Sequence, residues 1–212
     1  MKTARPQSGV ARRKNPKRRI IVYIATSADG FIARPDGSVD WLDRPWPKGQ
    51  YGMPEFFKSI DTILWGRKTF MPVIEKGMDL SVYGPGIKNY VFSRSLTAAS
   101  SPAPQKTFGP GVEFVNEPIK PFAQRLRAQP AAAGLSAGAG KPRKNIFMMG
   151  GAELIAAFLD EGEIDEFSIH VIPVLIGEGI PLVAPRHRNV QLALLSTKTF
   201  PDGVVHLNYR VV

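Results

Sequence analysis

Short apolar runs rich in β-branched and aromatic residues recur along the chain, and their length is typical of strands that are covered on both faces of a sheet. The predicted strands are RIIVYIAT (19–26), DTILWG (61–66), YVFSRS (90–95), VEFVN (112–116), NIFMM (145–149) and the first part of IDEFSIHVIPVLIGEGIPLV (164–183). Two more runs, LALLS (192–196) and VVHLNYRVV (204–212), flank a Pro-Asp-Gly turn and predict a terminal hairpin.

Three segments between these runs predict helices. MPEFFKSI (53–60) has a proline near its start, PIKPFAQRLRAQ (118–129) is predicted to be helical despite Pro121 near its start, and a third helix begins near Ala152 after a Gly-Gly turn. Strands that alternate with helices indicate a mainly parallel α/β sheet, with the terminal hairpin antiparallel at one edge. The length of 212 residues favours one such domain, and we expect it to span residues 20–212.

The formal net charge of +10 is concentrated at the N-terminus. Residues 1–19 hold eight Lys or Arg and no acidic residue, whereas the rest of the chain holds 20 basic and 18 acidic residues. We therefore expect residues 1–19 to be a disordered basic tail on a nearly neutral domain. A nucleic-acid-binding arm and an organelle-targeting segment remain open for this tail.

Other features of the composition exclude whole classes of chemistry. The chain has no cysteine, which excludes disulfides, thiol catalysis and cysteine-ligated metals and fits a cytoplasmic location. It also has no run of 18 apolar residues, so we expect no membrane span. His187 and His206 show no metal-ligand spacing, and we predict no metal site.

Residues 130–144 are rich in alanine and glycine and predict a flexible surface insertion. Their sequence GAGK is similar to part of a phosphate-binding loop. That interpretation fails because Leu135 stands where the leading glycine is required and Pro142 stands where Ser or Thr is required.

Three junctions between a predicted strand and the next element share one design. They are Gly66-Arg67-Lys68-Thr69, Ser93-Arg94-Ser95 and Gly150-Gly151-Ala152. In an open α/β sheet, ligands bind beyond the carboxyl ends of the strands, where a helix N-terminus offers free N–H groups. Glycine allows close approach of the backbone, and Arg and Lys supply positive charge. The three junctions together predict a phosphate-binding site.

The same stretches carry a family resemblance. IVYIATSADGFIA, PEFFKSIDTILWGRKTF, YVFSRS and IFMMGGAELIAAFL resemble, in order and spacing, conserved blocks of the dihydrofolate reductase superfamily. SADGFIARPDGSVDWL and IDEFSIHVIPVLIGEG are most similar to the riboflavin-biosynthesis reductase domain and its stand-alone bacterial relatives. The resemblance covers residues 19–212 and implies a three-layer αβα sandwich. It also implies hydride transfer from NADPH to a C=N or C=O carbon.

Matched by position, the resemblance implies a cofactor site. Its residues are Ala25, Ile32, Gly66, Arg67, Lys68, Thr69, Ser93, Arg94, Gly150, Gly151 and Ala152. Residues 66–69 match the segment that binds the pyrophosphate and 2′-phosphate of NADPH, and Ser93 and Arg94 match a second 2′-phosphate contact. Ala25 and Ile32 match residues that touch the nicotinamide ring.

The resemblance also implies a cis peptide bond between Gly150 and Gly151. This glycine turn would lie under the pyrophosphate of the cofactor, with the N-terminus of the following helix beside it.

At the positions that match substrate-binding residues, the sequence differs from both the dihydrofolate reductases and the riboflavin-pathway enzyme. Met53 occupies the position of the pterin-binding carboxylate of dihydrofolate reductases, and Glu55 is about 200° further round the helix, which makes folate reduction doubtful. Ser38 and Trp41 resemble the substrate-side S-x-W of the riboflavin-pathway enzyme. That enzyme's Asp-Asp-Pro-x-Leu-x-x-Arg segment is absent.

The candidate catalytic residues are Asp29, Asp40 and His170. The candidate substrate-binding residues are Ser38, Trp41, Met53 and Phe57. Several of these have equally plain structural interpretations: Asp29 can shape a turn, Phe56 or Phe57 can belong to the core, and His170 can be a core histidine.

The leading hypothesis is an NADPH-dependent reductase of a small pterin-, pyrimidine- or sugar-like substrate, forming a homodimer through its apolar C-terminal strands. The alternative is a non-catalytic nucleotide-binding protein, or a nucleic-acid-binding protein that uses the basic tail. The nearly neutral domain disfavours nucleic acid as a partner.

Overall fold

Residues 18–94, 111–129 and 144–212 are described by a computed structural model. Residues 1–17 of the predicted tail therefore lie outside the described residues. The predicted insertion lies outside them except for Lys144.

Eight strands form the central sheet of the described residues, in the order β5-β4-β3-β6-β1-β7-β10-β9. Their bounds are β1 (Ile20–Ser27), β3 (Ile60–Gly66), β4 (Lys88–Phe92), β5 (Val112–Val115), β6 (Asn145–Gly150), β7 (Glu166–Ile172), β9 (Leu192–Thr199) and β10 (Val205–Val211). The strands from β5 to β7 are parallel, whereas β10 is antiparallel to β7 and to β9. The prediction of a mainly parallel sheet with an antiparallel C-terminal edge is confirmed.

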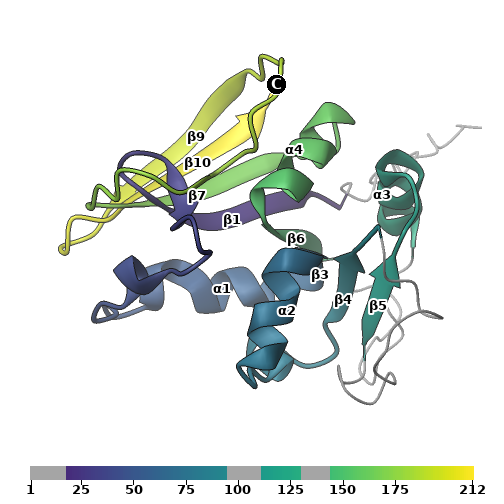
Figure 1. The fold of residues 1–212 in the computed structure, drawn as a ribbon, viewed down its shortest axis with the longest axis horizontal. Coiled ribbons are helices and arrows are strands. Elements are labelled where there is room, and N and C mark those ends of the chain that lie inside the picture. The colour runs from purple at the N-terminus through teal and green to yellow at the C-terminus, as the bar shows by residue number, and fades with distance from the viewer. Residues whose placement is uncertain (1–17, 95–110, 130–143) are drawn as a thin grey trace, which may run out of the picture.

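Helices cover both faces of this sheet, as Figure 1 shows. The helices are α1 (Met53–Lys58), α2 (Arg67–Glu75), α3 (Ile119–Ala128) and α4 (Ala152–Asp160). One core cluster joins the sheet to α3 and α4 through Phe122, Ile155 and Phe158, and a second joins it to α1 and α2 around Trp65 and Phe70. The three-layer αβα arrangement is thus confirmed.

The third strand is shorter than the predicted 90–95, because β4 ends at Phe92. Gly66 is the last residue of β3, and it pairs with Phe92. Beyond Gly66 the chain turns into α2, so β4 loses its neighbour on that side. On the other side, the N–H of Ser93 makes one more bond to the carbonyl of Val115 at 3.0 Å, at the end of β5.

A second, two-stranded sheet pairs β2 (Phe31–Ala33) with β8 (Ile180–Pro181). The hydrophobic pattern did not predict it, because strands of two or three residues show no period. Gly179 makes the close approach feasible: a Cβ at this position would lie 2.3 Å from the carbonyl oxygen of Ala33.

Arg18, which falls within the predicted tail, is buried with 4% of its surface exposed. Its guanidinium donates to the carbonyls of Lys144 and Leu126 at 2.9 and 3.0 Å and to the hydroxyl of Thr62 at 2.9 Å. It also forms an ion pair with Asp61. A buried arginine needs such partners, and residues distant in the sequence supply them.

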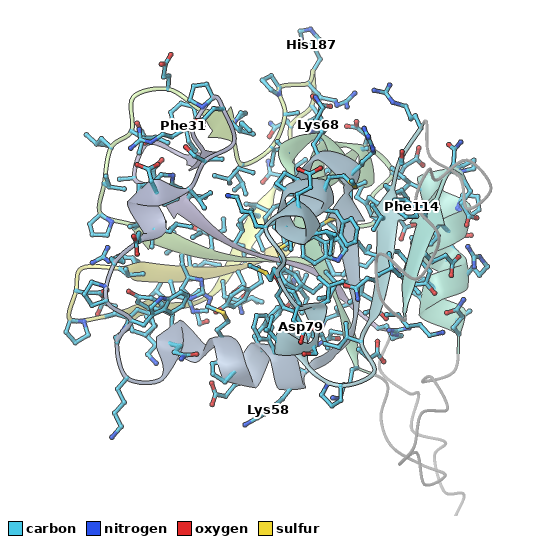
Figure 2. All side chains as sticks on the ribbon, turned by 60° about the horizontal axis from the view of Figure 1, so that its bottom comes forward. Phe31, Lys58, Lys68, Asp79, Phe114 and His187 are labelled. Carbon is cyan, nitrogen blue, oxygen red and sulfur yellow. The ribbon has the colours of Figure 1, made fainter. Side chains whose placement is uncertain are left out.

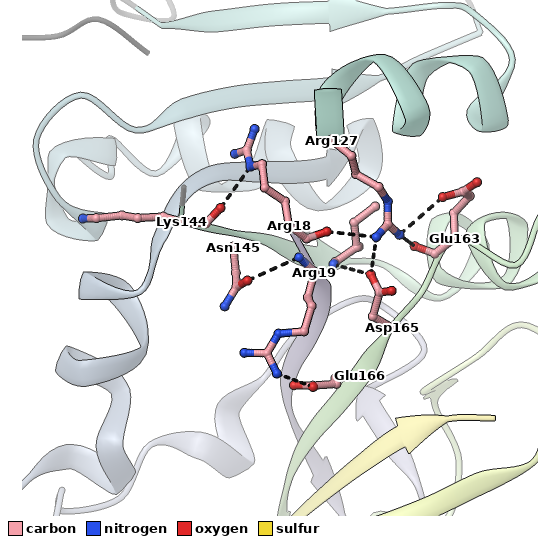
Figure 3. A network of polar contacts seen from close by, with 9 residues as sticks. Arg18, Arg19, Arg127, Lys144, Asn145, Glu163, Asp165 and Glu166 are labelled. Atoms are coloured by element: carbon pink, nitrogen blue, oxygen red, sulfur yellow. Dashed lines mark hydrogen bonds and ion pairs between the residues drawn. The ribbon is translucent and has the colours of Figure 1, made fainter. Parts of the chain in front are cut away.

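A second buried arginine completes this network, which Figure 3 shows at close range. Arg127 of α3 donates to the carbonyl of Arg18 at 2.9 Å and to Asp165 at 2.6 Å, and it pairs with Glu163 at 3.3 Å. Asp165 also accepts the N–H of Ile20 at 2.8 Å. The network fixes the first residues of β1 at the amino ends of the parallel strands, opposite the edge where a ligand binds in this class of sheet.

Candidate active site

The three predicted phosphate-binding junctions come together in the structure. They follow β4, β3 and β6, which are neighbours in the sheet and are parallel, so their carboxyl ends lie at one edge. Strand β1, which carries Ala25, is the next neighbour of β6. Residues from four separate parts of the chain therefore share one edge of the sheet.

Two helices begin at this edge without a side-chain cap. The N-cap of α2 is Gly66 and the N-cap of α4 is Gly151, and neither helix has a side-chain hydrogen bond at its N-terminus. The first N–H groups of a helix have no partner within the helix, and together with the helix dipole they favour an anion. The peptide bond between Gly150 and Gly151 is cis, as predicted.

Small residues allow these two helix starts to lie close together. A Cβ on Gly66 would lie 3.3 Å from the carbonyl oxygen of Gly150, and a Cβ on Gly151 would lie 3.1 Å from the hydroxyl of Thr69. Ala152, the first residue of α4, is buried and clusters with Ala156 and Ala184. Any larger side chain at either glycine would separate the two helix N-termini.

Three cations at this edge have no acidic partner among the described residues: Arg67, Lys68 and Arg94, all of which are exposed. Most arginines of the described chain do pair with a carboxylate, namely Arg18, Arg19, Arg34, Arg44, Arg125, Arg127, Arg186 and Arg188. Figure 2 shows Lys68, on the first turn of α2, at the opposite side of the view from Lys58 at the end of α1. Unpaired cations beside two free helix ends suit a phosphate ligand.

The remaining predicted cofactor residues lie around these helix ends. Ser93 is buried just after β4, with 8% of its surface exposed. Ile32 of β2 packs against the cluster that contains Ala152, at the start of α4. Ala25 is half-buried near the end of β1 and pairs with His170 of β7.

Asp29 and Asp40 occupy positions that fit a structural role better than catalysis. The carboxylate of Asp29 is exposed and accepts the backbone N–H groups of Ile176 and Gly177 at 3.1 and 2.8 Å. A hydrogen bond from the side chain of Ser27 is the largest cause that holds the pKa of Asp29 below its usual value, and these two backbone bonds add to it. Asp40 is likewise exposed and forms a two-bond ion pair with Arg34, at 2.6 and 3.0 Å, which lowers the pKa of Asp40.

His170 lies buried on the face of the sheet that α1 covers. Its ring stacks on His206 with the centroids 4.2 Å apart, and its centroid lies 4.9 Å from that of Tyr23. Burial, reinforced by His206, lowers the pKa of His170 to about 4. The ring is therefore neutral at pH 7.

The tautomer of His170 follows from its hydrogen bond. Nε2 lies 3.3 Å from the carbonyl oxygen of Tyr51, and a carbonyl only accepts, so Nε2 carries the proton. The Nδ1 atom then keeps its lone pair. As a neutral ring, His170 can accept a proton or a hydrogen bond at Nδ1, but it cannot supply a proton as an imidazolium.

A contact that sequence patterns do not reveal holds Tyr51 in place. Gln50 and Tyr51 adopt φ angles of 45° and 57°, which are unfavourable for residues other than glycine. The hydroxyl of Tyr51 donates to Asp202 in the β9–β10 turn, and Arg44 pairs with the same carboxylate at 3.2 Å. The terminal hairpin thus fixes the segment that bonds to His170.

Helix α1 places its aromatic residues against the sheet. Phe56 stacks on Tyr23, and Phe57 lies edge-on to Tyr83 with a centroid distance of 5.2 Å, so both belong largely to the core. Met53, at the start of α1, is half-buried.

The predicted substrate residues Ser38 and Trp41 lie in the segment that follows β2. The N–H of Ser38 bonds to Asp36 at 2.8 Å and its carbonyl accepts the N–H of Arg34 at 2.9 Å, which closes a turn. The indole N–H of Trp41 is buried and has no hydrogen-bond partner among the described residues. Trp41 therefore has a buried donor without a partner in the described chain.

No cluster of three or more His, Asp or Glu side chains among the described residues could hold a metal ion. No helix in this part of the chain has the length and apolar character needed to cross a membrane.

The structure is thus a mainly parallel α/β domain whose sheet edge carries glycines, uncapped helix ends and exposed cations. Comparison with known proteins identifies the family: residues 18–206 match the model of the RibD C-terminal domain, and the chain belongs to that family.

Individual relatives agree with this assignment. The chain is 36% identical to the uncharacterized protein YwjB of Bacillus subtilis over 189 residues, which is 89% of this chain and 95% of that protein. A putative riboflavin biosynthesis protein from Shewanella sp. PV-4 superposes with a TM-score of 0.73 at 25% identity, covering 92% of this chain and 99% of that one. Dihydrofolate reductase from Enterococcus faecalis, complexed with NADP(H), shares the fold with a TM-score of 0.57 at 15% identity, covering 91% and 96%.

Proposed function

We propose that the protein is an NADPH-dependent reductase that acts on a C=N or C=O group of a small pterin-, pyrimidine- or sugar-like substrate. The observation that carries this proposal is the edge at which α2 and α4 begin, with Arg67 and Arg94 exposed and without carboxylate partners in the described chain. Membership of the RibD C-terminal domain family supports it.

The residues at this edge fit the phosphates of a dinucleotide. The N–H groups at the start of α2 and α4 would bind the pyrophosphate, and Gly66 and Gly151 allow the two helix starts to lie close enough together to share it. Arg67, Lys68 and Arg94 would bind the additional phosphate of the adenosine ribose, for which full positive charge is needed.

Residues further along the edge would position the reacting ring. Ala25 and Ile32 lie where β1 ends and α4 begins, and their small or apolar side chains would flank the nicotinamide. The bound cofactor supplies a hydride. The protein's own contribution is orientation of the two reactants and exclusion of water.

The substrate would bind on the side of Trp41, Met53 and His170. Because Met53 offers no carboxylate, we do not propose folate as the substrate. His170 is neutral and would act as a hydrogen-bond acceptor at Nδ1. We assign Asp29 and Asp40 to the positioning of loops, since their carboxylates already have partners.

We also propose a homodimer formed through the C-terminal strands. Strand β9 is an edge strand, and its leucines are exposed: Leu192 by 43%, Leu194 by 56% and Leu195 by 46%. An exposed apolar edge invites pairing with a second copy of the chain.

A cofactor-oxidation assay tests the proposed function. The protein is mixed with NADPH and a panel of cyclic imines, dihydropterins, pyrimidines and sugar aldehydes, and absorbance at the dihydronicotinamide band is followed. We expect oxidation with at least one class of substrate. Failure to bind NADPH, together with no turnover across the panel, would refute the proposal.

A further inference from the structure

The hydroxyl of Tyr23 is buried and has no hydrogen-bond partner among the described residues. Buried tyrosine hydroxyls usually have a partner, because removing the group from water without one is unfavourable. Tyr23 lies in β1, two residues before Ala25, so the two side chains share one face of that strand.

The neighbours of Tyr23 are mainly aromatic and come from three elements. Its ring stacks on Phe56 of α1, with the centroids 4.1 Å apart and the planes at 16°. Phe147 of β6 lies edge-on at 6.3 Å, and His170 of β7 lies at 4.9 Å. None of these side chains accepts a hydrogen bond from the hydroxyl in the described chain.

Packing alone does not explain a tyrosine at this position. A phenylalanine would make the same stack on Phe56 and would bury no unpaired polar atom. Burial and then the negative charge of Glu55 raise the pKa of Tyr23, so the hydroxyl remains protonated and able to donate. What the hydroxyl lacks is an acceptor within hydrogen-bond distance among the described residues.

We propose that the hydroxyl of Tyr23 donates a hydrogen bond to a carbonyl oxygen or ring nitrogen of a planar heterocyclic substrate. This inference rests on the proposed function, which places the nicotinamide beside Ala25 and the substrate on the side of His170, and it narrows the substrate class to rings that carry an acceptor. Aromatic neighbours suit a flat ring, and a single polar contact fixes its orientation.

The Tyr23→Phe variant tests this proposal, with Tyr83→Phe as the matched control. Tyr83 is a half-buried tyrosine whose hydroxyl contacts only the sulfur of Met78 at 3.9 Å, away from His170. Three quantities are measured for both variants and the parent protein: the urea midpoint of unfolding, the Kd for NADPH, and the Kd for pterin and for uracil by calorimetry.

We expect Tyr23→Phe to weaken pterin or uracil binding about tenfold while NADPH affinity stays at the parental value. Its urea midpoint should equal or exceed that of the parent, because an unpaired hydroxyl is removed. Tyr83→Phe should leave both probe affinities unchanged.

Three results would overturn the proposal: parental affinity for both probes in Tyr23→Phe, no binding of either probe by the parent, or a lower urea midpoint in Tyr23→Phe. The last result would show that the hydroxyl is already bonded, for example to a trapped water. If the parent binds a probe but not NADPH, the proposed function fails and the probe titrations still decide the role of Tyr23.

Discussion

Gly66 and Gly150 lie in contact across two neighbouring strands, so that a Cβ on Gly66 would come within 3.3 Å of the carbonyl oxygen of Gly150 and 3.4 Å of the nitrogen of Gly151. Both of these atoms belong to the backbone, which would move aside less readily than a side chain if a Cβ were added to Gly66. The contact brings the starts of α2 and α4 together and thereby forms the proposed phosphate site.

Gly66→Ala should therefore weaken NADPH binding at least about tenfold and cost about 1–3 kcal/mol of unfolding free energy through overpacking. The backbone of Gly66, with φ of −77°, suits alanine, so any effect comes from crowding. Titration with NADPH and urea unfolding measure the two quantities.

Gly37→Ala is the control for this substitution. Gly37 has φ of 85° and open space around its Cα, so alanine there is strained without crowding a neighbour. It should lower stability but leave NADPH affinity unchanged. Unaltered NADPH affinity in Gly66→Ala would argue against a phosphate site between the two helices.

The lowered pKa of His170 predicts that the free energy of unfolding depends on pH. Its pKa is about 4 in the folded protein and 6.5 in the reference state, so the unfolded chain binds the proton first as pH falls. The stabilisation is complete above pH 6.5 and is lost as pH falls towards 4. Between pH 7.5 and pH 5 the free energy of unfolding should decrease by about 2 kcal/mol from this residue.

Urea unfolding across this pH range measures the slope. His170→Gln should flatten it, whereas His187→Gln should not, because His187 is exposed. His206, whose pKa is also lowered by burial, acts in the same direction and should leave a residual slope. An identical slope in His170→Gln and the parent would contradict the assignment.

Truncation of the N-terminus should distinguish the contribution of residues 1–17 to the unfolding free energy from that of Arg18 and Arg19. A chain that begins at Arg18 keeps the buried ion network, and we expect its unfolding free energy to match that of the full chain. A chain that begins at Ile20 removes the cationic partners of Asp61 and Glu166 and the carbonyl of Arg18 that Arg127 bonds to, and should be less stable by about 3–5 kcal/mol. Equal stability of the two truncated chains would show that Arg18 contributes little.

Leu194→Glu should convert the proposed homodimer into a monomer, because a buried charge without a partner opposes association. Light scattering at micromolar concentration measures the mass. Leu175→Glu is the control: Leu175 is 74% exposed in the loop that follows β7 and is not part of β9, and its replacement should leave the mass unchanged. A monomeric parent protein would refute the dimer.

Much of the fold could be predicted from the sequence, because β-branched runs reveal buried strands locally. The convergence of Gly66, Arg94 and Gly150 was also predictable, since the carboxyl ends of parallel strands share an edge. Arg18 was misassigned because a basic run at a terminus has the same composition whether its last arginine is buried or solvated.

The substrate side resisted prediction for a different reason. The bond between Tyr51 and Asp202 joins residues 151 positions apart and depends on the placement of a hairpin turn. The unpaired hydroxyl of Tyr23 depends equally on tertiary packing, since its ring neighbours come from α1, β6 and β7. Neither feature leaves a periodic or local signal in the chain.

The central claim is best tested by titrating NADPH and NADH separately into the parent, Arg67→Ala and Lys76→Ala. Lys76 caps the opposite end of α2 and is exposed, so it matches Arg67 in charge but not in place. We predict that the parent prefers NADPH, that Arg67→Ala weakens NADPH about tenfold with NADH nearly unchanged, and that Lys76→Ala alters neither. Equal losses for both cofactors in Arg67→Ala, or no binding of NADPH by the parent, would contradict the account.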